Sequence, residues 1–140
     1  ADFPAEDFGF EAFLAGVDAI LMGRATYEAV RRLGDWPHPD KTTVVVTSRP
    51  LPDPPAGVEA QGGPLDAIAS GLEARGLARV WIEGGGRIVS AMLALGRLDV
   101  LEMAVIPVVL GDGIPLFPPG APETKLRLMR SSRRKGPLAR

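Results

Sequence analysis

Three consecutive glycines, Gly84, Gly85 and Gly86, stand between a short apolar run and a segment with the apolar spacing of a helix. Glycine has no β-carbon, so a ligand can approach the backbone closely at these positions. The helix that follows would point unpaired N–H groups and the positive end of its dipole into the same space. This combination is typical of an anion site, above all for a phosphate, although a tight turn without a ligand would use the same glycines.

Two other short segments carry groups that bind phosphate, Gly-Arg-Ala-Thr at residues 23–26 and Thr-Ser-Arg at residues 47–49. Guanidinium groups bind phosphate oxygens through charge-assisted hydrogen bonds, and hydroxyl groups add further contacts. Each segment alone is open to a simpler interpretation, since Arg24 and Arg49 could be solvated charges and Thr26 could cap a helix.

The elements that must position these segments are strands alternating with helices. The apolar patterns predict strands at residues 17–22, 42–47, 58–61, 80–82, 100–110 and 125–129, and helices at residues 6–15, 26–33, 64–75 and 86–95. Such alternation implies a mostly parallel sheet with helices on both faces. Because the strand-to-helix turns of a parallel sheet all emerge at its carboxyl edge, the three phosphate-binding segments should converge there.

The amino-acid composition limits which other functions the chain could have. With 140 residues, 46% hydrophobic content and a formal net charge of -1, the chain fits one globular domain. It has no cysteine and a single histidine, His38, so we predict no metal site and interpret His38, between two prolines, as a surface loop residue. The longest apolar run is too short to span a membrane, and a cytoplasmic protein is expected. The cationic end of the chain has no aromatic residue for base stacking, so no nucleic acid partner is expected.

Four segments, ILMGRATYE, VVVTSRP, VWIEGGG and AVIPVVLGDGIPLFP, occur in an order and spacing that resemble the dihydrofolate reductase-like superfamily. The resemblance extends from about residue 8 to residue 129 and is strongest to the branch formed by the riboflavin-biosynthesis pyrimidine reductase domain and its free-standing bacterial relatives. It implies a three-layer α/β fold with a mostly parallel central sheet, helices on both faces and an antiparallel C-terminal edge, as a single domain over residues 1–140. It also implies an NADPH-dependent reductase that transfers hydride to a small pyrimidinone-like or pterin-like heterocycle.

Particular residues take their expected roles from this resemblance. The cofactor-binding residues would be Gly23, Arg24, Thr26, Thr47, Ser48, Arg49, Glu83, Gly84, Gly85, Gly86, Arg87 and Ile88. The loop flanking the substrate pocket would be Gly111, Asp112, Gly113, Ile114, Pro115, Leu116 and Phe117. The residues themselves favour NADPH over NADH, because Arg24 and Arg49 offer cations for a 2′-phosphate where NAD enzymes place an acid.

The family's first strand and substrate loop, and its last strand, are expected to be missing from the sequence given. The catalytic proton donor is therefore unassigned. The nearby carboxylates are Glu6, Asp7, Glu11 and Asp18, but acidic residues are common at a helix N-terminus for the sake of its dipole. A non-catalytic nucleotide-binding module is the alternative function. Relatives of this branch imply a homodimer built through the last strands, and the apolar residues 100–110 would suit that interface.

Overall fold

The computed structural model of the chain describes residues 9–132, which belong to two units. The described part of the first unit comprises residues 9–16 and 123–132. It contains the short helix α1 (Phe10–Ala15), preceded by Gly9 in the left-handed conformation at φ 82°. The predicted helix is thus confirmed from residue 10 onward, while residues 6–8 of that prediction and the cationic residues after 132 lie outside the described part of the chain.

The second unit, residues 17–122, is built on a sheet of four parallel strands in the order β3-β2-β1-β4. The strands are β1 (Ala19–Gly23), β2 (Thr42–Val46), β3 (Val58–Gln61) and β4 (Val80–Gly84). β1 lies between β2 and β4, and its first four residues are buried. The β-branched run of β2 fits the position beside it, since branched side chains pack well on a pleated surface.

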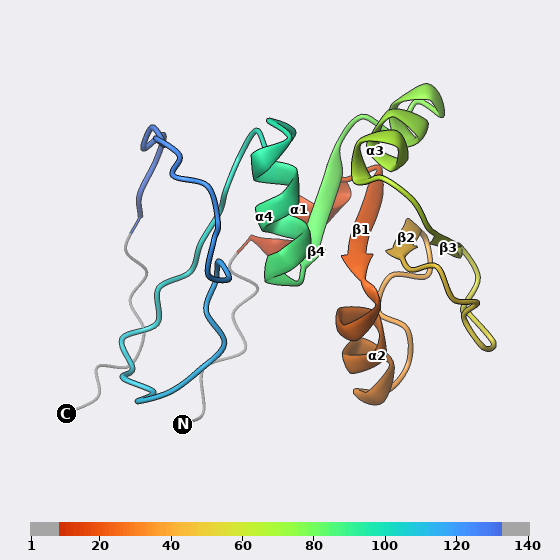
Figure 1. Cartoon of the computed structure of the whole chain (residues 1–140). Helices are drawn as coiled ribbons and strands as arrows, with labels where there is room; N and C mark the ends of the chain where they lie inside the picture. The colour runs from red at the N-terminus through yellow and green to blue at the C-terminus, as the bar shows by residue number, and fades with distance from the viewer. Residues whose placement is uncertain (1–8, 133–140) are drawn as a thin grey trace. The chain divides into compact units, whose positions relative to one another are not determined.

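Helices cover both faces of this sheet. α2 (Arg24–Arg32) connects β1 to β2, α3 (Leu65–Ala74) connects β3 to β4, and α4 (Gly86–Ala94) follows β4 (Figure 1). The connection from β1 to β2 moves across the sheet in one direction, and the connection from β3 to β4 moves in the other. Right-handed crossovers in opposite directions place α2 and α3 on opposite faces of the sheet. The core beneath α3 and α4 contains Leu21, Val44, Ile68, Leu72 and Met92. The predicted α/β class with a mostly parallel sheet is confirmed.

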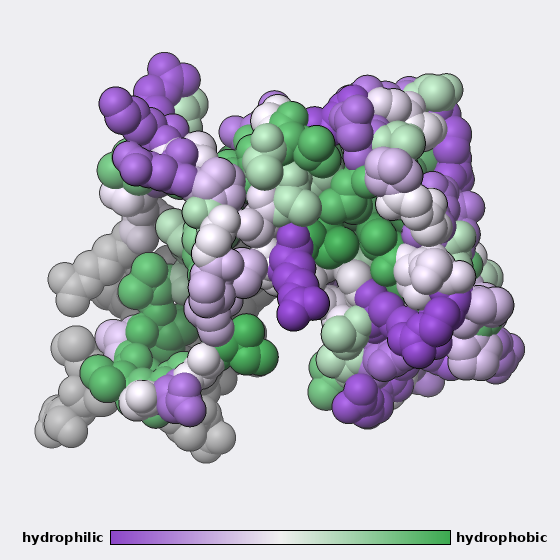
Figure 2. Space-filling view, viewed as in Figure 1, coloured by the Kyte–Doolittle hydropathy of each residue, from purple (hydrophilic) through white to green (hydrophobic). Residues whose placement is uncertain are grey.

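The prediction of strands at residues 100–110 and 125–129 is wrong. Within residues 9–132 no strand follows β4, so the antiparallel edge predicted there is not formed. Val105 and Val109 are exposed, and the N–H group of Val108 bonds locally to the carbonyl group of Ile106. Alternating apolar residues can favour an extended backbone, but only a neighbouring strand can complete a ladder of hydrogen bonds. Figure 2 shows apolar side chains lying open on the surface of the chain that follows α4.

None of the helices within residues 9–132 has the length and apolar character needed to cross a membrane.

Candidate functional site

The order of the strands in the sheet reverses between β1 and β4. The carboxyl ends of these two strands mark this switch point. The connection from β1 goes to β2 on one side, while β4 lies against the other side of β1. Ligands of open parallel sheets bind at such a switch point, outside the carboxyl ends of the strands. The turns that begin α2 and α4 both lie there (Figure 1).

The β1 and β4 turns are in direct contact. A β-carbon built on Gly85 would lie 3.5 Å from the hydroxyl oxygen of Thr26, and one built on Gly23 would lie 3.5 Å from Cγ1 of Ile88. The residue that caps α2 is Gly23, so Thr26 does not cap the helix. Its hydroxyl group instead faces the glycine turn, which a side chain on Gly85 would crowd.

The glycine turn has a backbone that few other residues could adopt. Gly84 has φ 132°, a value that side-chain-bearing residues rarely take, and the Gly84–Gly85 peptide bond is cis. The carbonyl group of Gly85 accepts hydrogen bonds from the N–H groups of Ile88 and Val89. The first N–H groups of α4, those of Gly86 and Arg87, lie at the end of the helix where no earlier helical carbonyl can accept them. This is the geometry of an anion-binding helix N-terminus.

The third turn, after β2, is joined to the first by Arg24. Its Nη1 atom lies 3.4 Å from the Thr47 hydroxyl oxygen and 3.3 Å from the carbonyl oxygens of both Arg49 and Pro50. Its Nε atom also pairs with Glu28 at 2.7 Å. The three turns therefore converge at one edge of the sheet, as predicted. Ser48 and Arg49 are exposed there.

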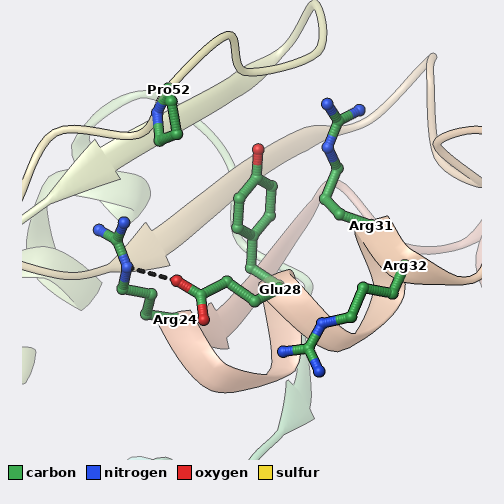
Figure 3. Close-up of a pocket in the computed structure, with 6 residues that line it drawn as sticks. Arg24, Glu28, Arg31, Arg32 and Pro52 are labelled. Atoms are coloured by element: carbon green, nitrogen blue, oxygen red, sulfur yellow. Dashed lines mark hydrogen bonds and ion pairs between the residues drawn. The ribbon is translucent and has the colours of Figure 1, made fainter.

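A shallow pocket of about 300 Å³ extends from Arg24 along α2. Figure 3 shows Arg24 and Arg31 reaching toward the side on which Pro52 lies, whereas Arg32 points away from it. The remaining lining residues are Tyr27 and Glu28. The three guanidinium groups make the pocket positive, with one carboxylate to offset them. Arg31, Arg32 and Pro52 were not predicted as site residues from the sequence, although α2 has arginine in both its first and its last turn.

The late loop, predicted to flank a substrate pocket, reaches the site at one end only. A β-carbon on Gly86 would lie 2.8 Å from the carbonyl oxygen of Leu116 and 3.6 Å from that of Pro115. At the other end, the N–H group of Gly113 bonds to the carboxylate of Asp112 at 2.7 Å. Ile114 is 98% exposed. Of this loop, Pro115 and Leu116 therefore lie against the glycine turn, and Pro118, just beyond the loop, lies there with them.

His38 is buried at 5% exposure, so its prediction as a surface residue is wrong. The flanking prolines fold the loop after α2 so that the imidazole lies edge-on to Trp36 and Trp81, with ring centroids 5.9 and 5.6 Å away. Its Nε2 atom lies 3.6 Å from Oε2 of Glu83. Burial lowers the pKa of His38 and raises the pKa of Glu83.

Glu83 lies two residues after Trp81 and so shares the face of β4 that His38 contacts, and the strand bulges at this point. Leu21 pairs with Ile82 and Met22 with Gly84, which leaves Glu83 without a partner on β1. Bulges are frequent next to binding sites because the extra residue re-aims a side chain. The sequence predicted Glu83 as a cofactor-binding residue of the glycine turn, and the spacing between His38 and Glu83 gave no signal of their contact.

Of the carboxylates considered as proton donors, Asp18 lies at the opposite edge of the sheet. Asp18 accepts a hydrogen bond from the backbone N–H group of Arg79 at 2.8 Å, at the amino end of β4. Glu11 belongs to α1 in the other unit, and Glu6 and Asp7 lie outside the described residues.

Comparison with protein families gives a match between the chain and the RibD C-terminal domain over residues 5–137. Among solved structures, a protein from Shewanella sp. PV-4, named provisionally as a riboflavin biosynthesis protein, superposes with a TM-score of 0.77 and 26% sequence identity. That alignment covers 94% of this chain and 76% of the other.

Three curated proteins are similar in sequence. YwjB of Bacillus subtilis (strain 168), named as uncharacterized, is 37% identical over 87% of this chain and 71% of its own length. YyaP of the same organism, also named as uncharacterized, is 27% identical over 79% of this chain and 65% of its own length. Dihydrofolate reductase HdrB of Haloferax volcanii is 34% identical over 53% of this chain, a match that spans 39% of HdrB.

Proposed function

Because the chain belongs to the RibD C-terminal domain family, we propose that it is an NADPH-dependent reductase that transfers hydride to a small pyrimidinone-like or pterin-like heterocycle. The family match and the similarity to a dihydrofolate reductase make the chain a reductase-like domain. The cofactor and the substrate class are the parts that we propose.

The observation that carries the proposal is the convergence of the three turns. Thr26 faces the glycine turn at one side, and Arg24 is tied to Thr47 and to the backbone of Arg49 at the other. A dinucleotide phosphate needs close backbone approach, which Gly85 allows because a side chain there would crowd the Thr26 hydroxyl group. The residues present therefore fit NADPH.

The chain's residues would bind and orient this cofactor. In the proposal, the glycine turn and the first N–H groups of α4 bind the pyrophosphate, while Ser48, Arg49 and the guanidinium group of Arg24 bind the 2′-phosphate. The cofactor supplies the hydride, and the protein supplies orientation and charge. Residues 115–118, which lie against Gly86, would border the bound substrate.

The exposed apolar chain after α4 supports a second part of the proposal. Val105, Val109 and Leu110 are exposed at 89%, 96% and 81%, more apolar surface than a monomer usually leaves open in one segment. We propose that a second copy of the chain covers these residues, and that the protein is a cytoplasmic homodimer.

The test of cofactor binding is a calorimetric titration with NADPH and with NADH. Arg49→Ala removes an exposed guanidinium group, and hydrogen bonds to charged groups are worth about 1.5–3 kcal/mol. NADPH affinity should therefore fall about tenfold to a hundredfold in this variant, while NADH affinity should change little. Arg79→Ala is the matched control, because Arg79 is also exposed but lies at the amino end of β4, the opposite edge of the sheet.

Four results would contradict the proposal in different ways. If neither cofactor binds, the reductase function is wrong. Equal affinities for NADPH and NADH would remove the 2′-phosphate site. An equal loss of affinity in Arg79→Ala would show a general charge effect. Binding of NADPH without its oxidation by any pyrimidinone or pterin substrate would favour the non-catalytic nucleotide-binding module.

A further inference from the structure

The side of α2 that borders Pro52 carries a pocket of about 300 Å³, a volume at the lower end of the range for small-molecule sites. The α2 residues that line it are Arg24, Tyr27, Glu28, Arg31 and Arg32. Their spacing of three and four residues places them on one face of the helix. The pocket therefore extends along α2, away from the edge of the sheet where the helix begins.

The cations at the two ends of the pocket differ in what they already bind. The guanidinium group of Arg24 is occupied, since its Nε atom donates to Glu28 and its Nη1 atom donates to the Thr47 hydroxyl oxygen. The side chains of Arg31 and Arg32 are exposed, and within residues 9–132 they form no hydrogen bond or ion pair. The unpaired positive charge therefore lies at the end of the pocket that is far from the glycine turn.

An arginine in the last turn of a helix can also serve the helix dipole. Figure 3 separates the two arginines in this respect, because Arg31 reaches toward the side of Pro52 while Arg32 points away from it. The position of Arg32 suits the dipole alone. That of Arg31 places its guanidinium group at the pocket.

Tyr27 gives a second and independent indication of a ligand. It lines the same pocket and is only 4% exposed, and its buried hydroxyl group has no hydrogen-bond partner among the described residues. Buried polar atoms nearly always have a partner, so this one calls for an explanation. Tyr27 and Arg31 are four residues apart on the helix, where side chains are neighbours. One acceptor group in the pocket could therefore take a hydrogen bond from each.

We propose that this pocket binds a phosphate group, which accepts hydrogen bonds from the hydroxyl group of Tyr27 and the guanidinium group of Arg31. Three guanidinium groups and one carboxylate leave two positive charges, which match a phosphate dianion. The site goes beyond the cofactor site proposed above. Arg31 follows Arg24 by seven residues, about 10 Å along a helix, so this phosphate is not the one expected beside Arg49.

The two donors contribute differently to the site. The ring of Tyr27 packs on Trp36 with the ring centroids 5.7 Å apart, so its hydroxyl group is held in place. The hydroxyl oxygen is closed to water in the free protein, and a phosphate reaches it only when the exposed side chains that line the pocket move. Tyr27 is thus the fixed donor, and Arg31 is the donor that adjusts to the ligand.

The first experiment uses Tyr27 as a reporter inside the pocket, since it is the chain's single tyrosine. Titration of isotope-labelled protein with inorganic phosphate at constant ionic strength should shift the tyrosine NMR signals along a saturating curve. Arg31→Gln should weaken the binding about tenfold or more, because it removes a charge-assisted hydrogen bond. Arg79→Gln is the matched control, since Arg79 is also exposed but lies at the opposite edge of the sheet, and it should leave the curve unchanged.

The same titration with phenyl phosphate distinguishes two sources of this chemistry. Tighter binding than that of inorganic phosphate would assign the pocket to a small phosphate monoester whose organic part contacts the walls. Equal or weaker binding would assign it to free phosphate. A shift that never saturates, or an equal loss in Arg31→Gln and Arg79→Gln, would be general charge screening and would overturn the proposal.

The second experiment tests the hydroxyl group with Tyr27→Phe. In phosphate-free buffer this variant should melt no lower than the wild type, because the hydroxyl group that it removes has no partner. Phosphate should raise the Tm of the wild type by mass action and raise that of the variant less. Phosphate bound at the glycine turn acts equally on both proteins, so the difference belongs to the pocket. An equal rise in both would overturn the role of Tyr27.

A final titration separates this inference from the proposed function, on which it does not rest. With NADPH at saturation, inorganic phosphate should still shift the tyrosine signals. If NADPH abolishes that response, the pocket belongs to the cofactor site and the inference is wrong, while the proposed function stands. If NADPH does not bind and phosphate does, the proposed function fails and this inference stands.

Discussion

Gly86 offers a direct test of how the late loop meets the glycine turn. A β-carbon at this position would lie 2.8 Å from the carbonyl oxygen of Leu116 and 3.5 Å from Cδ of Pro118. Real side chains essentially never come within 3.0 Å of another heavy atom at their β-carbon, so Gly86→Ala must displace the backbone of residues 115–118. The displaced group is a backbone carbonyl, which cannot simply rotate away.

The size of the effect follows from two opposing terms. Overpacking costs about 1–3 kcal/mol. Replacing glycine by alanine in a helix returns about 1 kcal/mol at most, and less at the first helical residue. Gly86→Ala should therefore lower the free energy of unfolding by about 1 kcal/mol, which corresponds to a fall in Tm of about 4 °C for a domain of this size.

The matched control is Gly71→Ala in α3, where a β-carbon would meet nothing within 4 Å. The same substitution should there stabilise the protein by about 0.5–1 kcal/mol. Urea denaturation of both variants gives the two free energies of unfolding. Should Gly86→Ala stabilise the protein as Gly71→Ala does, residues 115–118 would not lie against the turn, and their proposed place beside the substrate would be lost.

Other substitutions test the core, the electrostatics and the association of the chain. Leu72→Ala removes a side chain at 1% exposure and should lower the free energy of unfolding by about 2–5 kcal/mol, whereas Leu33→Ala, at 88% exposure, should change it by less than about 0.5 kcal/mol; denaturant titrations measure both. Burial raises the pKa of the Glu83 carboxyl group, so the folded protein binds the carboxyl proton more tightly than the unfolded chain does. The protonated carboxyl group therefore stabilises the folded protein at low pH, and this stabilisation is lost as the pH rises through the pKa of the folded state. Glu83→Gln should therefore gain in stability relative to the wild type as the pH rises above the ordinary carboxyl pKa, and a constant difference in unfolding experiments would refute this account. The wild type should have twice the mass of one chain in light scattering, and Val109→Asp should be monomeric while Leu33→Asp remains a dimer; a monomeric wild type would exclude the homodimer.

The sequence allowed the parallel sheet and its three turns to be predicted because their signals are local. The β-branched run of residues 42–46 and the spacing of Ile68 and Leu72 each reflect the element in which they occur. A parallel sheet then brings the turns to one edge through its topology alone, so no contact between distant residues had to be known.

The remaining features depend on contacts that no local pattern encodes. His38 is buried because a loop folds onto the face of the sheet that carries Trp81, and two flanking prolines alone suggested an exposed turn. The bulge that separates Glu83 from the register of β1 arises from pairing between strands some sixty residues apart. Residues 100–110 alternate as a strand would, but a strand also needs a neighbour, about which their own sequence carries no information.

The aromatic contacts around His38 have a spectroscopic consequence. The chain contains two tryptophans and one tyrosine, and Tyr27, Trp36 and Trp81 all belong to the array that contacts His38. Nearly all of the protein's near-ultraviolet absorption and emission therefore originates within a few ångströms of one imidazole. Because imidazolium quenches indole emission and neutral imidazole does so far less, the intrinsic fluorescence is a built-in reporter of the charge on His38. A titration curve can thus be recorded on the native chain without any label.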